Sequence, residues 1–342
     1  MTVRVPQLLL IFVQALAAHE GVHEGRAHRC IHDELHPRVA VRPQRYAELS
    51  DRDHEHHALA DDRRALATDA DDWQPLRIAV DYSSIDNATT LATIQDLVPY
   101  ATSKLASALR VRPALAPLVV SGERCHEAAV PAAHGVDGVA DADFVLYVTA
   151  DADDGTDDAD ADVPLAWAVH CEVDQFGRPT AGQVHFHSQY FGLSIETLRS
   201  TALHEIVHAL AFSSDLLPTF RNGLGDAWAP TTATADARGE AVTVVTTPAV
   251  RDAARAHLGC DTLAGAELED SGGISSAGSH WESRVFGPEL MAASIGAAQN
   301  SPALSSLTLA LFEDSGWYRP DYDVAAPKCF FDASWCAAAD GG

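Results

Sequence analysis

The strongest local pattern in the sequence is a helix that carries two histidines on one face. Ser194 is a good N-cap residue, and apolar residues then keep helical spacing from 195 to about 212. Inside this helix lies His204-Glu205-Ile206-Val207-His208. Residues four apart lie on the same side of an α-helix, so both imidazoles point in one direction. We therefore expect the rest of the chain to pack around this helix and to complete a site on its histidine-bearing face.

Two imidazoles at this spacing can bind one zinc ion, each at about 2 Å. Glu205 would lie beside the metal rather than on it. We expect it to act as a general base that takes a proton from a zinc-activated water and passes it to a leaving amine. A surface helix with two incidental histidines is the alternative, which the amphipathic pattern disfavours. The motif alone also fits a zinc hydrolase that is not a peptidase.

A catalytic zinc needs a third protein ligand and an open fourth position. The compact pattern HExxHxxGxxH is absent, because Ala211 and Ser214 stand where it needs Gly and His. His280 is the better candidate for the third ligand. His257 is the alternative, and it is less favoured because it falls inside a short helical pattern at 249–258.

Met291 is the one methionine besides the initiator, and it follows His280 by eleven residues. A lone methionine is usually a core filler. Its position just after a candidate ligand favours a Met-turn instead.

The N-terminus has the features of an export signal. Residues 1–18 combine Arg4, an apolar run at 8–13 and small residues at 15–18, which is typical of a signal peptide. The run is too short to cross a bilayer, and no transmembrane helix is expected elsewhere. Six cysteines without a CxxC pair then predict disulfides. Asn87-Ala88-Thr89 is a candidate glycosylation site.

Composition changes along the chain. Residues 19–70 are polar and rich in histidine, and we interpret them as a removable pro-segment. Beyond Trp73, strands are predicted at 76–80, 144–148, 165–169 and 183–187, with turns at 177–179 and at Gly182. Helices are predicted at 91–110, 249–258 and 304–314, and 215–275 is otherwise turn-rich. The stretch 141–162 is rich in aspartate, and Asp151–Gly155 within it is interpreted as a solvated acidic loop rather than a calcium loop. The net charge of −26 disfavours nucleic acid and anionic lipid as partners.

Further motifs accompany the HExxH pattern, most densely between 200 and 320. They are His204–Leu210, Gly259–Leu263, Glu267–Asp270, Ala277–Glu282, Glu289–Met291 and Leu307–Tyr318, with Arg29–Leu35 and Leu76–Val80 upstream. Together these motifs resemble the leishmanolysin family of surface zinc metalloproteases.

The resemblance implies an α+β, metzincin-like fold. Its parts would be an active-site helix, a mixed twisted sheet, an insertion of about sixty residues before the third ligand, and a Met-turn at Met291. It implies a secreted or cell-surface endopeptidase that acts on proteins or peptides. One Zn²⁺ would lie on His204, His208 and His280, with Glu205 as the catalytic base. The chain would divide into a signal peptide (1–18), a pro-segment (19–70), a catalytic subdomain (71–214) and a C-terminal subdomain (215–342).

The resemblance also assigns roles to cysteines. Cys30 would cap the zinc in an inactive precursor, since a thiolate is a good zinc ligand. Cys125 would pair with Cys171, and Cys260 with Cys329, which leaves Cys336 without a partner. The family's cysteine-rich C-terminal region and lipid-anchor signal are not expected here, so membrane association would need an anchor outside this sequence.

Two departures from the family pattern bear on activity. Ala211 replaces a glycine and would let the active-site helix run further, and the C-terminal region is missing. The competing prediction is therefore a weak or inactive relative that acts in adhesion or host binding.

Overall fold

The structure, a computed structural model, describes residues 35, 39–46, 72–151, 163–222, 225–228, 230–270, 277–287, 289–292 and 304–325. The expected signal peptide, most of the expected pro-segment, and Cys30, Cys329 and Cys336 lie outside these residues. Within them, no helix combines the length and the apolar character that crossing a membrane requires.

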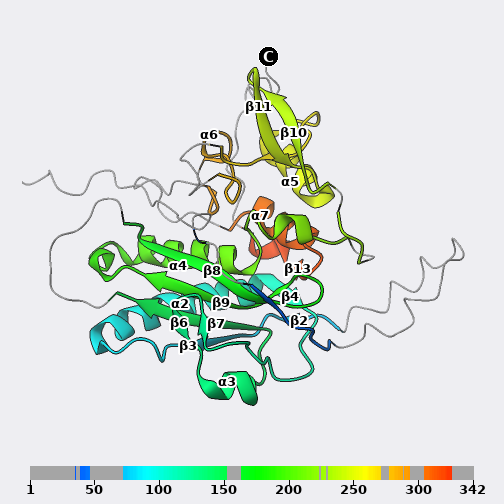
Figure 1. The fold of residues 1–342 in the computed structure, drawn as a ribbon. Helices are drawn as coiled ribbons and strands as arrows, with labels where there is room; N and C mark the ends of the chain where they lie inside the picture. Colours follow the sequence, from blue (N-terminus) through cyan, green and yellow to red (C-terminus); the bar gives the residue numbers. More distant parts are fainter. Residues whose placement is uncertain are drawn as a thin grey trace, which may run out of the picture.

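A five-stranded mixed sheet forms the lower half of the molecule (Figure 1), in the order β1-β8-β9-β7-β3. β9 runs parallel to β7 and antiparallel to β8. The strands are β1 (Ala40–Val41), β3 (Ile78–Asp81), β7 (Phe144–Ala150), β8 (Ala166–Val173) and β9 (Pro179–Phe186). The strands predicted from apolar runs are confirmed, with shifted ends.

Two long helices cover one face of this sheet. α2 (Ala88–Ala108) packs beside α4 (Ile195–Leu210), and α4 contacts β8 and β9. β7 is buried on both faces, which explains its continuous apolar run. Phe144, Leu146 and Val148 join the helices in one core, while Val145 and Tyr147 face a second, smaller core.

That smaller core contains a disulfide between Cys125 and Cys171. It links β8 to the hairpin of β5 (Arg124–Cys125) and β6 (Ala128–Ala129). The short helix α3 (Ala132–Val136) follows this hairpin. Cys260 is also disulfide-bonded, and its expected partner, Cys329, is not among the described residues.

Gly182 is not a turn residue, contrary to the prediction. It lies inside β9, where a Cβ atom would come within 2.7 Å of the Val169 carbonyl oxygen and 2.8 Å of the Phe144 ring. Its role is close packing in the sheet. The other predicted turn, at 177–179, is confirmed at Gly177, which precedes β9 and has φ +85°.

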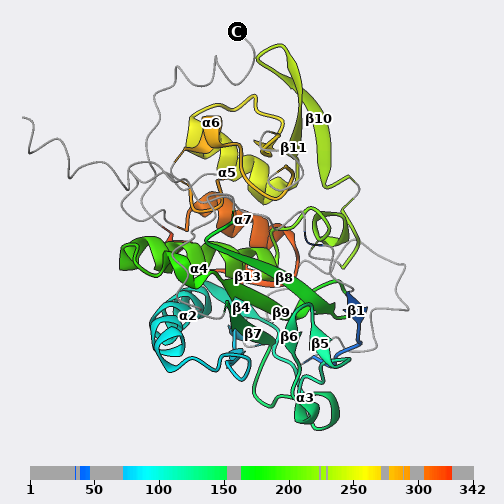
Figure 2. The ribbon, with the colours of Figure 1, turned by 60° about the vertical axis from the view of Figure 1, so that its left-hand side comes forward.

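The segment 215–275 contains a β-hairpin that the sequence did not reveal. β10 (Thr232–Ala237) pairs with β11 (Glu240–Val245), and β12 (Ala266–Glu267) adds to β11. Arg238 and Gly239 both have positive φ, as a two-residue type I′ turn requires. The small and threonine residues of β10 hid the alternation. Together with α5 (Pro248–Leu258) and α6 (Ser283–Phe286), this hairpin lies at the end of the molecule away from α3 (Figures 1 and 2).

Helix α7 (Ser306–Asp314) lies between that end and the sheet (Figure 2). A small sheet next to it joins β2 (Gln74–Pro75), β4 (Leu109–Val111) and β13 (Tyr318–Pro320). Short 3-10 turns occupy η5 (Ser188–Tyr190), η6 (Leu217–Thr219) and η8 (Tyr322–Val324). The helices predicted near 91–110, 249–258 and 304–314 are confirmed as α2, α5 and α7.

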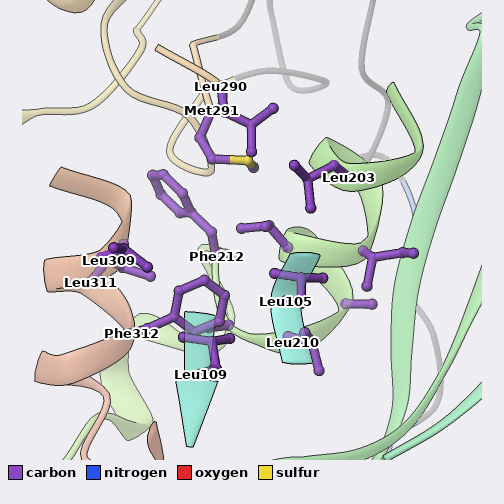
Figure 3. Close-up of a cluster of buried hydrophobic side chains, with 14 of the residues drawn as sticks. Leu105, Leu109, Leu203, Leu210, Phe212, Leu290, Met291, Leu309, Leu311 and Phe312 are labelled. Carbon is purple, nitrogen blue, oxygen red and sulfur yellow. The ribbon is translucent and has the colours of Figure 1, made fainter. Parts of the chain in front are cut away.

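The main core joins parts that are far apart in the sequence (Figure 3). Leu105 of α2, Leu210 of α4 and Phe312 of α7 are fully buried there. Leu290 and Met291 pack against the same cluster beside Phe212. The 290–291 segment is therefore anchored by apolar packing to the helix that carries the HExxH motif.

Part of the expected pro-segment is packed into the fold. β1 pairs with β8, and the Tyr46 hydroxyl donates to Asp174 at 2.6 Å and accepts from Arg178 at 3.1 Å. The Arg178 guanidinium lies 4.6 Å from the centre of the Tyr46 ring. Residues 39–46 therefore form part of the sheet edge and its buried ionic cluster.

Two aspartates of the Asp-rich stretch 141–162 make contacts within the fold. Asp143 is buried and holds the guanidinium of Arg77 through two bonds of 2.9 Å. Asp151 contacts His185 and His187. Residues 152–162 are not described.

Candidate metal centre

Helix α4 begins where its sequence predicts and ends earlier than expected. The Ser194 side chain accepts from the Thr197 amide at its start, as the capping prediction requires. The helix stops at Leu210. Ala211 has φ −160°, which is extended backbone open to any residue, so the expected continuation through Ala211 does not occur. His204 and His208, one turn apart, lie on the buried side of this helix.

The fold brings His280 to the same point. The Nε2 atoms of His204 and His208 are 3.0 Å apart, and the Nε2 atom of His280 lies 3.2 and 3.1 Å from them. All three residues are fully buried. Four tetrahedral ligands at 2.0–2.1 Å from zinc would be about 3.3 Å from one another. The spacing of the three nitrogens is close to this value.

The protonation of two rings follows from their outer contacts. His204 Nδ1 lies 2.7 Å from the Leu290 carbonyl oxygen, and His208 Nδ1 lies 2.7 Å from the Phe212 carbonyl oxygen. A carbonyl oxygen can only accept, so each Nδ1 carries the proton. The Nε2 atoms of the neutral rings then present lone pairs to each other.

This arrangement fits a cation. Lone pairs 3.0 Å apart repel each other, and protonated imidazoles would place buried positive charges in contact. A metal ion at the centre of the three Nε2 atoms removes both costs. The outer Nδ1–H bonds also orient the rings, as they do around metal sites generally. Three neutral imidazoles suit zinc among the common biological cations.

A turn at Glu289–Ala292 supports the centre from outside. Its Leu290 carbonyl accepts from His204, and its Met291 carbonyl accepts from the Trp281 amide at 2.9 Å. Trp281 directly follows His280. One turn therefore fixes a ring on α4 and the chain beside the third histidine.

Glu289 holds this turn in place. Its carboxylate accepts from the Met291 amide, from Ser305 Oγ at 2.7 Å and from Thr308 Oγ1 at 2.6 Å. Thr308 Oγ1 also accepts from Trp281 Nε1 at 3.0 Å. Burial raises the pKa of Glu289, although these hydrogen bonds act in the opposite direction. The sequence places Glu289 within a family motif and predicts no role for it, because its partners Ser305 and Thr308 lie at the start of α7.

The remaining predicted residues have different surroundings. Glu205 is fully buried on α4, next to His204. His257 lies in α5, with its ring 5.8 Å from that of Phe286, and it is not in the histidine cluster. Asn87 is exposed and caps α2, where its side-chain oxygen accepts from the amides of Thr89 and Thr90.

Two further groups have donor sets that a metal ion could use, among the residues described. One is Asp151, His185 and His187. The other is Glu269, Asp270 and Glu282. In the latter, Arg284 donates to Glu282 at 2.7 Å and to Asp270 at 3.1 Å, so an arginine already balances the carboxylates.

Comparisons with known proteins identify relatives of the chain. A peptidase M8 family model, described as leishmanolysin, matches residues 86–339. A leishmanolysin-like peptidase of Caenorhabditis briggsae is 32% identical over 80% of this chain and 52% of its own length. Leishmanolysin of Leishmania donovani is 29% identical over 94% and 57%. The ciliated left-right organizer metallopeptidase of Mus musculus is 38% identical over 55% and 28%.

The chain spans about half the length of the first two of these curated relatives. The family match runs from the start of α2 to beyond α7, and so includes the HExxH helix, His280 and the 289–292 turn. On this match, the chain belongs to the leishmanolysin family.

Proposed function

We propose that this protein is a zinc-dependent endopeptidase that hydrolyses peptide bonds of proteins. One Zn²⁺ would be held by His204, His208 and His280, and Glu205 would be the general base. The observation that carries the proposal is the convergence of three buried Nε2 atoms within 3.2 Å of one another in a chain of a zinc-dependent peptidase family.

The residues of the centre would have separate roles that follow from their positions. A zinc ion on three neutral imidazoles would supply a Lewis acid that polarises the peptide carbonyl and acidifies a water. Glu205 follows His204 on the same helix, so its carboxylate would lie beside that water rather than bind the metal. It would accept the water proton as the new C–O bond forms and return it to the amine nitrogen as the C–N bond breaks. His204 and His208 keep their Nδ1 protons on backbone carbonyls throughout.

The turn at Glu289–Ala292 would be the Met-turn of a metzincin-like fold. In support, Met291 is fully buried and the neighbouring Leu290 carbonyl orients His204. The segment between α4 and His280, with the β10–β11 hairpin and α5, would be the family's insertion before the third ligand. Residues 71–214 and 215–342 would be the two subdomains around the centre.

Export and activation are part of the proposal. Residues 1–18 would be a signal peptide, and removal of the pro-segment at 19–70 would free the zinc from Cys30. Because residues 39–46 pair with β8 and bind Arg178, a cut after them would leave this strand in the sheet. Asn87 would be glycosylated, and Cys260 would pair with Cys329.

The test is cleavage of an unfolded protein substrate by the zinc-loaded, activated chain. Glu205→Gln should reduce the rate by about 100- to 10,000-fold, the usual contribution of a general base, and leave zinc content unchanged. Glu196→Gln is the matched control, because Glu196 lies exposed in the first turn of the same helix. It should keep wild-type activity.

Two results would contradict the proposal. One is an activated, zinc-loaded wild-type chain that cleaves nothing, which would favour an inactive adhesion or host-binding relative. The other is full activity in Glu205→Gln, which would remove the assigned base.

A further inference from the structure

A second histidine cluster lies at the ends of two neighbouring strands. β7 and β9 are parallel, and Ala150 of β7 pairs with Phe186 of β9. Asp151 and His187 are the next residues on the two strands, so they leave the same edge of the sheet side by side. His185 and His187 are two apart and therefore share one face of the strand. The register alone places one carboxylate and two imidazoles together.

The three side chains are in contact. His185 Nε2 lies 3.1 Å from Asp151 Oδ1, and His187 Nδ1 contacts Asp151 Oδ2. One ligand atom from each of the three residues lies within 4.8 Å of the others. Ligands of a zinc ion would be separated by about 3.3 Å. Small side-chain rotations would bring all three donors onto one ion.

The His185 ring is held in place from several directions. Its Nδ1 atom lies 2.8 Å from Thr149 Oγ1, which in turn accepts from Gln183 Nε2 at 2.7 Å. The Trp167 indole stacks on the ring at 5.0 Å between centroids and 15° between planes. These contacts aim Nε2 at Asp151, and an oxygen partner on the outer nitrogen is typical of metal-binding histidines.

The cluster is open to solvent on one side. Side-chain exposure is 44% for Asp151, 15% for His187 and 9% for His185. An ion could therefore enter without the fold opening.

We infer that Asp151, His185 and His187 form a second metal site, which binds a divalent transition-metal ion such as Zn²⁺. Two imidazoles and one carboxylate suit zinc, copper, nickel or iron, whereas calcium and magnesium need mainly oxygen ligands. The bound ion would connect the end of β7 to His187, where the chain enters η5 and then α4. This inference does not depend on the proposed peptidase activity.

The experiment counts metal in the full-length protein. Wild type and variants are saturated with Zn²⁺, freed of loosely bound ion by gel filtration and measured by mass spectrometry of the metal. Asp151→Asn and His187→Gln should each hold one zinc fewer per chain than wild type. The difference is the readout, because histidines in the N-terminal tract also bind zinc in some conditions.

Asp141→Asn is the matched control, since it makes the same chemical change at a side chain that is 96% exposed. It should hold as much zinc as wild type. Circular dichroism and thermal melting identify any variant that fails to fold. If a variant does not fold, its zinc count is replaced by a competition experiment on the wild-type protein. A tenfold excess of Ca²⁺ should then displace no zinc.

A folded Asp151→Asn or His187→Gln that keeps the wild-type zinc count would overturn the second site, as would displacement of zinc by Ca²⁺. A peptidase centre that binds no zinc would give a different result from a missing second site. It would lower the wild-type zinc count by one and leave the difference between wild type and His187→Gln unchanged.

Discussion

The two histidine clusters use different backbone geometry to present similar donors. In the proposed peptidase centre, a helix spaces His204 and His208 by four residues, and His280 arrives from 72 residues further along the chain. At the strand ends, a β-strand spaces His185 and His187 by two, and Asp151 comes from the adjacent parallel strand. In the helical cluster, the third ligand comes from a distant part of the chain. In the strand-end cluster, the parallel pairing of β7 and β9 places the third residue, Asp151, beside the two histidines.

The clusters also differ in burial and in what orients them. His204, His208 and His280 are fully buried, and backbone carbonyls accept the Nδ1 protons of the first two. The strand-end cluster is part-exposed, and a threonine side chain orients His185. We therefore expect the buried cluster to hold its ion tightly and the part-exposed cluster to exchange its ion more readily.

The largest expected effect separates the two sites by chelation. When the zinc-loaded, activated chain is dialysed against EDTA, the strand-end zinc should leave first with activity retained. Loss of the buried zinc should then reduce proteolysis by roughly a hundredfold or more. Metal content and activity are measured on the same samples. His187→Gln should lack the first stage. Activity that falls in proportion to the first zinc lost would reverse this order.

A smaller effect is expected at Glu289. Glu289→Gln places an amide NH₂ where the carboxylate accepts from Thr308, Ser305 or the Met291 amide. The resulting mismatch should cost about 1–3 kcal/mol of unfolding free energy, measured by urea denaturation. Zinc affinity should fall at the His204 centre alone. Glu240→Gln, on the exposed hairpin, is the control and should change neither quantity.

Glu289→Gln should also change how the free energy of unfolding depends on pH. Burial raises the pKa of Glu289 above its ordinary 4.5, so the folded chain binds this proton more tightly than the unfolded chain. The contribution of this group to stability therefore falls as pH rises from about 4.5 through the raised pKa. Glu289→Gln should lack this component. An unchanged pH profile of stability in the variant would show that Glu289 is not the titrating group.

The smallest effect is expected at Thr149. Thr149→Val keeps the shape but removes the oxygen that faces His185 Nδ1 and Gln183. Zinc affinity at the strand ends should fall by roughly 10- to 100-fold, the usual effect of losing an outer partner of a metal-binding histidine. This affinity is measured by isothermal titration calorimetry with Zn²⁺. Thr149→Ser restores the hydroxyl and should bind as wild type does. Equal affinity in Thr149→Val would remove the assigned support.

The sequence by itself determined the HExxH helix and the features that depend on local spacing. Ser194 capping, the shared face of His204 and His208, and the apolar run of β7 all follow from residues within a few positions of one another. The hairpin β10–β11 was missed because small residues and threonine gave little alternation. The expected continuation through Ala211 was wrong because helix ends depend on packing as well as propensity.

Only the tertiary structure decided which distant residues meet. Spacing alone made His280 a preference among histidines and the family resemblance assigned it, but only the folded chain places its Nε2 atom 3.2 Å from that of His204. Glu289 and Thr308 have no local pattern, because their contact joins a turn to α7. Asp151 looked like part of a solvated acidic loop until the parallel register of β7 and β9 placed it against two histidines. Local spacing constrains a chain over a few residues, and long-range contacts are settled by how the elements bury their apolar faces together.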